Sequence, residues 1–573
     1  MPSRIEDHVS ILEGPQLPPL RDVNIGQLLD EQRKRYPERT AVVSRWQGRR
    51  LTYQDLHSDC LKIAQNLLSH GVRPGDRVVV LAGNALEYAQ LLFAVGGIGA
   101  IFAIINPTFT QEEILSAVEF LKPSAIFVAD RIGYRKNNSL LKDLASHPAQ
   151  PPLIVQLLSS ERVSPNVLTW HEFLQIGSSD AGSALLSQHW ARVDANDTLC
   201  IQFTSGTTGP KKAAMLSHRN LLNNAILVGD RLQYTADDVV CCCTPLFHCF
   251  ALVCGFLSAI AYGGAVVLPS DVFLAGANLQ ALSEEKITVL HGVPAMFQAL
   301  LDHPDAKKYA PDMCLRSGII AGSSLTHTLI SRLSVEFRLN LAYGYGMTEG
   351  SCIAFLTTPS EVSLLDDHSS VGTLMPHTSA KVVNDSLDAL PLGSPGELLL
   401  SGYLVFQKYY KNPEKTSEAL VEDIQGREWL RTGDLVTMDA SGRCTIIGRV
   451  KDLIKRGGEN IFPIDIEKSL EQHADISAAA VVGIPDATWG EVVVAFVKRN
   501  ERTKPGVKIG SKELKLWLRK RIAPHKMPEH FFWIGEGAGT PDELPINHSG
   551  KIVKAELRAV ASRLAHSRRT SES

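Results

Sequence analysis

The sequence lacks the features that mark several specialised classes of protein. Its 58 Lys and Arg residues balance 61 Asp and Glu residues, so the formal net charge is only −3. Proteins that bind nucleic acid usually carry a strongly basic face, so this balance argues against a nucleic-acid partner. Hydrophobic residues make up 44% and charged residues 21% of the 573 positions. Such a composition is typical of a globular chain rather than a disordered or fibrous one.

Paired cysteine motifs are also absent. The ten cysteines form no Cys-x-x-Cys pair, and five of them fall between Cys241 and Cys254 inside an apolar run. Disulfide scaffolds and zinc sites depend on characteristic spacings of cysteine or histidine, so we expect neither. We expect buried free thiols in a reducing compartment.

No segment has the pattern of a membrane span. The uncharged stretch 239–270 is interrupted by Pro245, Gly255 and Gly263, and acidic residues flank it. Spans are usually flanked by Lys or Arg, so a buried helix followed by a buried strand is the better interpretation. The first residues mix charges without an apolar core, and we expect no signal peptide. The C-terminal residues do not form a peroxisomal targeting tripeptide. The expected location is the cytoplasm or the peroxisome.

Alternating strands and helices in the first part of the chain predict an α/β fold. Strands are expected at 77–81, 100–105 and 125–128, with helices at 85–95 and 111–121 between them. This alternation is typical of a parallel sheet whose two faces are covered by helices.

The pattern changes twice in the second half of the chain. Short strands separated by turns begin near residue 371 and predict a small β-rich subdomain. After Arg449 a separate α+β pattern starts, with a turn at 483–490 and an amphipathic helix at 511–522. We therefore predict two domains, residues 1–449 and 450–573. The last 73 residues carry 15 Lys or Arg against 8 Asp or Glu, which indicates either a solvated surface or a basic lid over phosphates.

A loop rich in hydroxyl groups and glycine follows a predicted buried strand at 199–203. It reads Thr204-Ser205-Gly206-Thr207-Thr208-Gly209-Pro210-Lys211-Lys212. Hydroxyl, backbone N–H and ammonium groups bind phosphate oxygens, and glycines let the backbone approach them closely. The spacing is not that of a Walker A loop. The loop therefore predicts a phosphate site of a different kind.

This loop resembles the signature of the adenylate-forming superfamily, which includes acyl-CoA synthetases, coumarate-CoA ligases, luciferases and peptide-synthetase adenylation domains. Six further motifs follow in the family's order, and the resemblance extends from about residue 25 to 560. They are Pro245-Leu246-Phe247-His248, Tyr345-Gly346-Met347-Thr348-Glu349, Arg431-Thr432-Gly433-Asp434, Gly448-Arg449-Val450-Lys451, Lys455-Arg456-Gly457-Gly458-Glu459-Asn460 and Ser549-Gly550-Lys551.

The resemblance implies both a fold and a reaction. A large N-terminal domain of α/β subdomains with a small β-barrel would precede a small mobile α+β C-terminal domain. The reaction would use ATP and Mg²⁺, with coenzyme A as co-substrate. A carboxylic acid would attack the α-phosphate of ATP, and a thiol would then displace AMP from the acyl-AMP.

The resemblance also implies roles for single residues. Glu349 would bind Mg²⁺, and Thr348 would donate a hydrogen bond to a phosphate oxygen. Lys551 would bridge the acyl carboxylate and the α-phosphate. Lys451 would be the hinge on which the C-terminal domain turns between the two steps. His248 would lie at the gate between the acyl pocket and the thiol tunnel.

The nucleotide and thiol positions follow from the same motifs. Asp434 would bind the ribose hydroxyls, with Arg449 reaching the ribose from the linker. The remaining positions fall into two groups: an adenine segment of Gly322, Ser323, Gly344 and Tyr345, and a C-terminal loop of Lys455, Gly457, Gly458 and Asn460.

The phosphate loop departs from the family pattern at its end. Pro210 stands one place early, Lys211 occupies the usual proline place and Ala213 replaces the last glycine, while Lys212 stays in register. The grip on the β- and γ-phosphates is therefore expected to differ in detail.

The acyl substrate is constrained only by its predicted pocket. Segment 250–254, Val293, Pro294, Met296 and segment 321–323 are mostly apolar and offer no charged anchor. A short- to medium-chain acid, branched or hydroxylated, suits such a lining better than an amino acid does. The sequence is most similar to medium-chain and fungal specialised acyl-CoA ligases.

Three alternatives share the motifs. They are an adenylation enzyme that loads a carrier-protein thiol, a luciferase-like monooxygenase and a catalytically inactive nucleotide-binding protein. The sequence does not choose an oligomeric state.

Overall fold

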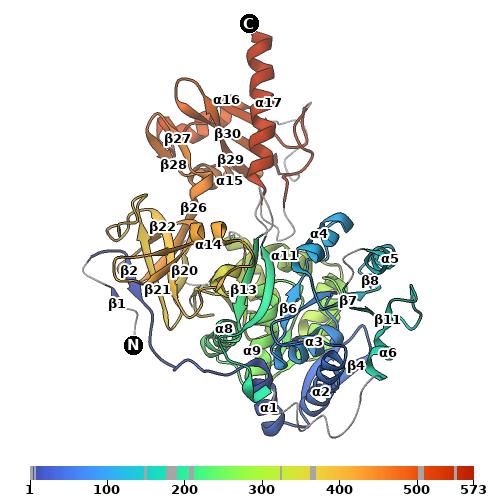
Figure 1. The fold of residues 1–573 in the computed structure, drawn as a ribbon. Helices are drawn as coiled ribbons and strands as arrows, with labels where there is room; N and C mark the ends of the chain where they lie inside the picture. Colours follow the sequence, from blue (N-terminus) through green and yellow to red (C-terminus); the bar gives the residue numbers. More distant parts are fainter. Residues whose placement is uncertain are drawn as a thin grey trace.

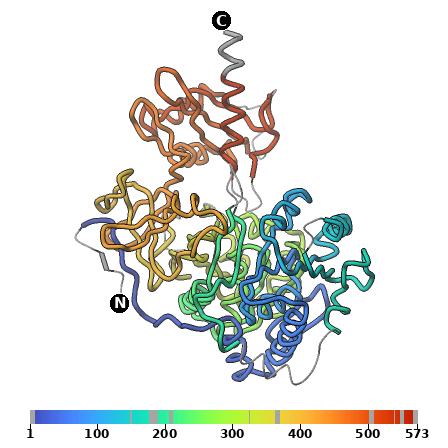
Figure 2. The backbone as a smooth tube through the Cα atoms, in the orientation of Figure 1, coloured from blue at the N-terminus to red at the C-terminus, as the bar shows by residue number. Residues whose placement is uncertain are grey.

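The computed structural model describes residues 4–5, 8–147, 151–175, 190–204, 212–322, 325–359, 361, 370–500, 509–537, 539–546 and 552–572. It confirms a mixed α/β chain with a large N-terminal part and a smaller C-terminal part (Figure 1). Three sheets of five or more strands build the large part, and a further sheet builds the small one. Figure 2 shows residues from about 450 onwards as a separate body at one end of the large part.

An eight-stranded sheet carries the phosphate loop. Its strands lie in the order β11-β10-β7-β5-β6-β12-β13-β23, and β10, β7, β5, β6 and β12 run parallel to one another. The predicted parallel sheet is therefore confirmed, with two antiparallel strands, β13 and β23, added at one edge. Its strands are β5 (Arg77–Leu81), β6 (Ile101–Ile104), β7 (Ala125–Ala129), β10 (Leu153–Leu157), β11 (Leu168–Thr169), β12 (Thr198–Thr204), β13 (Lys212–Ser217) and β23 (Lys408–Tyr409).

The helices around this sheet begin at recognisable caps. Helix α4 (Gln111–Leu121) starts with a capping box in which the Thr110 side chain and Glu113 satisfy each other's backbone N–H groups. Helix α3 (Leu86–Gly97) is buried at every position, as expected for a helix whose residues are mostly apolar on all sides. The other helices of this region are α1 (Ile25–Arg35), α2 (Tyr53–Ser69), α5 (Asn138–Ser146), α6 (Trp170–Gln175) and α8 (His218–Arg231). A short ribbon of β8 (Arg131–Ile132) and β9 (Arg135–Lys136) stands apart.

The uncharged stretch 239–270 lies in a second sheet. It folds into β14 (Val239–Cys241), the π-helix η1 (Ala251–Leu257), α9 (Ser258–Ala261) and β15 (Ala265–Leu268). All residues of η1 are buried, so the stretch is a buried helix followed by a buried strand, as predicted. Among the described residues, no helix combines the length and the apolar character that a membrane crossing requires. The sheet is completed by β3 (Thr40–Ser44), β4 (Arg49–Thr52) and β16 (Val289–Leu290).

An eleven-stranded sheet contains the strands of the predicted β-rich subdomain. Ten of them follow the order β1-β2-β21-β22-β25-β26-β20-β19-β18-β17, and β24 pairs with β25. They are β1 (Arg4–Ile5), β2 (Ile11–Glu13), β17 (Gly318–Ala321), β18 (Leu341–Tyr345), β19 (Phe355–Leu356), β20 (Ser370–Leu374), β21 (Thr378–Val383), β22 (Gly396–Gly402), β24 (Leu420–Glu422), β25 (Glu428–Met438) and β26 (Arg443–Arg449). The remaining helices of the large part are α10 (Ala275–Glu284), α11 (Pro294–Asp302), α12 (Ala306–Tyr309), η2 (Ala310–Asp312), α13 (His327–Glu336), η3 (Thr348–Gly350) and α14 (Pro413–Ala419).

The C-terminal part has its own sheet, in the order β28-β27-β30-β29 with β31 beside β30. The predicted turn at 483–490 is too long, because β29 continues to Asp486 and pairs there with Gly490, the first residue of β30. The elements are η5 (Val450–Asp452), β27 (Ile454–Arg456), β28 (Glu459–Ile461), α15 (Pro463–Glu471), β29 (Ile476–Asp486), β30 (Gly490–Arg499), α16 (Ser511–Arg519), η6 (Pro524–Lys526), β31 (His530–Trp533) and α17 (Lys554–Glu572).

The cysteines follow the prediction with one exception. All ten are free, and nine are buried, but Cys314 is exposed. It lies just after η2, where the chain runs over the surface before entering β17. Burial raises the pKa of the Cys60 and Cys200 thiols well above the usual value, as expected for inert core thiols.

A buried histidine makes the stability of the fold decrease at acid pH. The His291 ring accepts the backbone N–H of Ile319 at Nδ1 (3.0 Å), and Nε2 lies 2.7 Å from the Tyr234 hydroxyl. Burial lowers the His291 pKa from 6.5 to about 3. The unfolded chain therefore binds a proton more readily than the folded chain. The contribution of the neutral His291 ring to the free energy of unfolding is complete above pH 6.5 and is lost as the pH falls towards 3.

We expect His291→Gln to flatten the dependence of stability on pH. Between pH 6.5 and pH 5 the wild type should lose about 1.6 kcal/mol more than the variant, because the unfolded chain then takes up a proton that the folded chain does not. Urea unfolding at pH 6.5 and pH 5 measures this difference. His8→Gln, at an exposed position, is the control. Equal slopes in the wild type and His291→Gln would contradict the assignment.

Candidate active site

A buried carboxylate lies where β25 and β26 pair. Asp434 stands opposite Arg449 in this ladder, and the Arg449 Nε lies 2.9 Å from Asp434 Oδ1. The Tyr345 hydroxyl, at the end of β18, donates to Asp434 Oδ2 over 2.7 Å. Because each carboxylate oxygen has two lone pairs, both can still accept a further hydrogen bond from a ligand. The structure thus brings together the predicted ribose residues and the predicted adenine residue Tyr345.

The other adenine positions lie at the same sheet edge. Strands β17 and β18 are parallel, with Ala321 beside Gly344, so the residues that follow them emerge together. Gly322 has a φ of +97°, and a Cβ there would lie 3.3 Å from Val293 Cγ1. This contact places the adenine segment beside one predicted acyl-pocket residue. Ser323 lies outside the described residues.

Glu349 is the second buried carboxylate of the site. It lies in the short turn η3, which begins at the half-buried Thr348, and only 7% of its surface is exposed. The turn can follow β18 because residue 346 is glycine: a Cβ there would meet the Cys352 carbonyl oxygen at 1.5 Å. The Tyr409 hydroxyl donates to Glu349 Oε1 over 2.7 Å. In the part of the chain that the structure describes, no hydrogen bond to the second oxygen, Oε2, is present.

This carboxylate has the chemistry that a magnesium site requires. Mg²⁺ prefers hard oxygen ligands and usually combines one or two carboxylates with water and substrate phosphates. Glu349 offers one oxygen beside β13, the strand that follows the phosphate loop. The residues therefore fit an Mg²⁺ ion that arrives bound to a nucleotide. No group of three or more metal-ligating side chains that could hold an ion by itself is found among the described residues.

The two ends of the phosphate loop are described and lie together. Thr204 and Lys212 are opposite each other in the β12–β13 hairpin, and the Thr204 hydroxyl donates to the Lys212 carbonyl over 3.4 Å. The Lys212 ammonium lies 5.1 Å from the centre of the Tyr409 ring. The residues between them, Ser205, Gly206, Thr207, Thr208, Gly209, Pro210 and Lys211, lie outside the described residues, so their roles stay predictions.

The proposed gate residue lies just before the π-helix η1. His248 is half-buried, its ring centre lies 4.4 Å from that of Phe247, and its carbonyl accepts the Leu252 N–H over 3.0 Å. Phe250 lies edge-on to His291 with 6.0 Å between ring centres. Helical segments with π geometry are common at functional sites, which agrees with an acyl pocket here.

The predicted C-terminal residues form a separate hairpin. Lys455 and Asn460 are opposite each other in β27 and β28, and Gly457 and Gly458 make the turn between them. The Gly457 N–H donates to the Trp489 carbonyl over 2.7 Å. All four predicted residues are exposed, as a surface that meets a second substrate requires.

The predicted hinge residue is among the described residues, whereas the predicted catalytic lysine is not. Lys451 lies in η5, and its carbonyl accepts a 3.4 Å hydrogen bond from Arg558 of α17. Helix α17 therefore contacts the linker directly. Lys551 lies outside the described residues, and its role stays a prediction.

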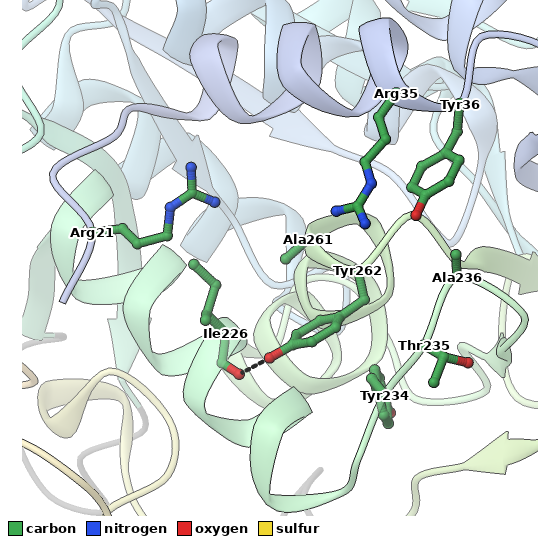
Figure 3. Close-up of a pocket in the computed structure, with 9 residues that line it drawn as sticks. All are labelled: Arg21, Arg35, Tyr36, Ile226, Tyr234, Thr235, Ala236, Ala261 and Tyr262. Atoms are coloured by element: carbon green, nitrogen blue, oxygen red, sulfur yellow. Dashed lines mark hydrogen bonds between the residues drawn. The ribbon is translucent and has the colours of Figure 1, made fainter. Parts of the chain in front are cut away.

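A cavity of about 440 Å³ lies away from all these residues (Figure 3). Two of its polar side chains already have partners: Arg21 pairs with Glu31, and the Tyr262 hydroxyl donates to the Ile226 carbonyl over 2.9 Å. It contains none of the predicted site residues and is not the candidate active site. Its lining residues are Arg21, Arg35, Tyr36, Ile226, Tyr234, Thr235, Ala236, Ala261 and Tyr262.

Sequence reasoning missed Tyr409 and Phe406. Both contact Glu349, Tyr409 through its hydroxyl and Phe406 through a 2.8 Å backbone hydrogen bond to the Glu349 carbonyl. Neither residue belongs to one of the seven family motifs. The only signal was a pair of adjacent tyrosines, Tyr409 and Tyr410, shortly before the helix start at Asn412-Pro413.

Comparison with known proteins gives a consistent result. The model of the AMP-binding enzyme family matches residues 29–410, and that of the AMP-binding enzyme C-terminal domain matches residues 465–551. The chain is 40% identical over 561 residues to acyl-CoA ligase sidI of Beauveria bassiana (strain ARSEF 2860), covering 97% of this chain and 95% of the relative.

Two further matches extend the comparison. Identity to the mitochondrial medium-chain acyl-CoA ligase ACSF2 of Danio rerio is 33% over 563 residues, covering 96% of this chain and 90% of the relative. The crystal structure of ATP-bound MatB from Rhodopseudomonas palustris matches with a TM-score of 0.76 and 25% identity, covering 94% of this chain and 99% of that one.

Proposed function

Because the chain belongs to the AMP-binding enzyme family, we propose that it is an acyl-CoA ligase acting in two steps. In the first step a carboxylate oxygen of the acid attacks the α-phosphorus of ATP, and pyrophosphate leaves. In the second step the thiol of coenzyme A attacks the acyl carbonyl carbon, and AMP leaves. The observation that carries the proposal is similarity over nearly the whole chain to enzymes named acyl-CoA ligases.

The nucleotide is proposed to bind beside the ends of β12 and β18, where β25 pairs with β26. Asp434 accepts hydrogen bonds from the ribose hydroxyls, while Arg449 and Tyr345 hold its carboxylate in place. Lys212 and Thr348 interact with phosphate oxygens. Glu349 would hold Mg²⁺, which would supply positive charge to those oxygens. Lys551 is proposed to offset the negative charge that builds up as the acid and the α-phosphate approach.

The C-terminal part is proposed to turn about Lys451 between the two steps. Residues 1–449 and 450–573 are the two proposed domains. The separation of the buried clusters supports this boundary: the main core extends to Cys444, and the C-terminal clusters begin at Ile454. Turning would exchange Lys551 for the Lys455–Asn460 hairpin, whose glycines allow the pantetheine arm of coenzyme A to lie close.

The proposed substrates are short- to medium-chain acids, branched or hydroxylated. The apolar walls around Phe250 and Val293 support this class because they offer no charge to an ionised side group. The proposed setting is fatty-acid or secondary metabolism in the cytoplasm or peroxisome.

A screen of acids tests the proposal. The protein is incubated with ATP, Mg²⁺ and hydroxylamine over a panel of fatty, aromatic and hydroxy acids, and acyl hydroxamate is measured. We expect acid-dependent hydroxamate and ATP–pyrophosphate exchange with at least one short- to medium-chain acid, and a thioester when coenzyme A replaces hydroxylamine. Background exchange over the whole panel would overturn the proposal. Exchange without a coenzyme A thioester, but with transfer to a carrier thiol, would favour the carrier-loading alternative.

A further inference from the structure

The segment 404–409 is hydrogen-bonded to the turn that carries Glu349. The Ser351 hydroxyl donates to the Leu404 carbonyl over 2.5 Å, and the Phe406 N–H donates to the Glu349 carbonyl over 2.8 Å. The Tyr409 hydroxyl donates to the Glu349 carboxylate. Three hydrogen bonds from one short segment thus hold both the backbone and the side chain of the turn.

Tyr409 is itself rigidly placed. It belongs to β23, which pairs with β13 so that Tyr409 lies opposite Ala214. Its N–H donates to the Thr416 hydroxyl over 3.0 Å, its ring lies 4.7 Å from that of Phe406, and only 3% of its surface is exposed. A buried ring on a paired strand has little freedom, so its hydroxyl oxygen has a defined position.

The same ring also contacts the end of the phosphate loop. The Lys212 ammonium lies 5.1 Å from the ring centre, a distance at which a cation is attracted to an aromatic face. Lys212 and Glu349 carry opposite charges and both contact Tyr409. In the described part of the chain they form no ion pair with each other. Tyr409 therefore contacts the Lys212 ammonium with its ring and the Glu349 carboxylate with its hydroxyl.

We propose that Tyr409 is a positioning residue for the nucleotide-bound metal. It occupies Oε1 of Glu349 and leaves Oε2 for the metal, and it keeps the Lys212 ammonium available for phosphate oxygens. Without it, Glu349 could rotate, and Lys212 and Glu349 could pair with each other instead of with the metal and ATP. This inference rests on the proposed function, because it takes Glu349 and Lys212 as ligands of metal-bound ATP.

The test compares two tyrosines that are adjacent in sequence. Tyr409→Phe removes only the hydroxyl that contacts Glu349. Tyr410→Phe is the matched control, because the Tyr410 ring packs against Phe120 and Lys411 instead. Mn²⁺ serves as a paramagnetic substitute for Mg²⁺, and its affinity is measured by electron paramagnetic resonance with the non-reactive analogue α,β-methylene-ATP. We expect about 10-fold weaker Mn²⁺ binding in Tyr409→Phe and unchanged binding in Tyr410→Phe.

A double-mutant cycle separates positioning from a general structural effect. In a Glu349→Gln background, Tyr409→Phe should change Mn²⁺ binding much less than in the wild-type background, because the carboxylate that it positions is gone. A fold-change of the same size in both backgrounds would overturn the proposal. Equal Mn²⁺ binding in Tyr409→Phe, Tyr410→Phe and the wild type would overturn it as well.

Failure of this inference differs from failure of the proposed function. If the wild type catalyses acid-dependent pyrophosphate exchange and Tyr409→Phe binds Mn²⁺ normally, only the role of Tyr409 is wrong. If the wild type shows no exchange with any acid, the proposed function is wrong. Circular dichroism and the urea midpoint of each variant show whether its fold is intact, and Tyr409→Phe keeps the ring that packs against Phe406.

Discussion

Lys551→Ala should reduce acyl-adenylate formation about 10²- to 10³-fold and leave thioester formation from supplied acyl-AMP close to the wild-type rate. The physical reason is local charge. In the first step a carboxylate approaches a phosphate, and an ammonium between them lowers the electrostatic cost of that approach. In the second step a thiol attacks a carbonyl group whose leaving group is already in place, and the proposed domain rotation has moved Lys551 away.

Two assays on the same variant check this result. ATP–pyrophosphate exchange measures the first step, and thioester formation from synthetic acyl-AMP and coenzyme A measures the second. Lys512→Ala is the control, because it removes an exposed cation from the same basic region of the chain. A loss of equal size in both assays would argue against separate roles for two faces of the C-terminal domain.

Local sequence patterns predicted the central sheet well. The predicted strand at 77–81 and helix at 111–121 coincide with β5 and α4. Runs of β-branched residues and a Thr–Glu capping box are signals carried by neighbouring residues, so no knowledge of tertiary structure is needed to read them. The 483–490 turn was predicted less well, because Gly483 suggested a loop whereas the long β29–β30 ladder carries the strand through it.

Contacts between distant segments could not be predicted in the same way. The motifs identified Glu349 and Asp434 as site residues, and nothing in them shows that Tyr409 and Tyr345 donate to these carboxylates. The pairing of β23 with β13 joins residues almost 200 positions apart, and it depends on how the whole sheet is assembled. Ser205, Lys211 and Lys551 lie outside the described residues, so their assignment rests on the motifs alone.

Asp434→Ala should lower kcat/KM for ATP about 10²- to 10³-fold, with most of the change in the KM. The carboxylate of Asp434 is proposed to accept hydrogen bonds from two ribose hydroxyls, and a hydrogen bond to a charged group contributes about 1.5–3 kcal/mol. The alanine variant also leaves Arg449 and the Tyr345 hydroxyl without the partner that they have in the wild type. A simple loss of activity would therefore not distinguish ligand binding from local rearrangement.

Deoxy analogues of ATP make that distinction. Wild-type enzyme should use 2′-deoxy-ATP and 3′-deoxy-ATP less well than ATP, because each analogue lacks one hydroxyl that Asp434 would bind. In Asp434→Ala this preference should disappear, since the acceptor is missing and the hydroxyl that distinguishes ATP from each analogue has no carboxylate to bind. Tyr345→Phe is the control: it removes the 2.7 Å hydrogen bond to Asp434 and keeps the carboxylate, so the preference for ATP should persist. If Asp434→Ala still discriminates between ATP and both analogues as the wild type does, the ribose is recognised by another residue, and the pairing of Asp434 with Arg449 serves only to join β25 to β26.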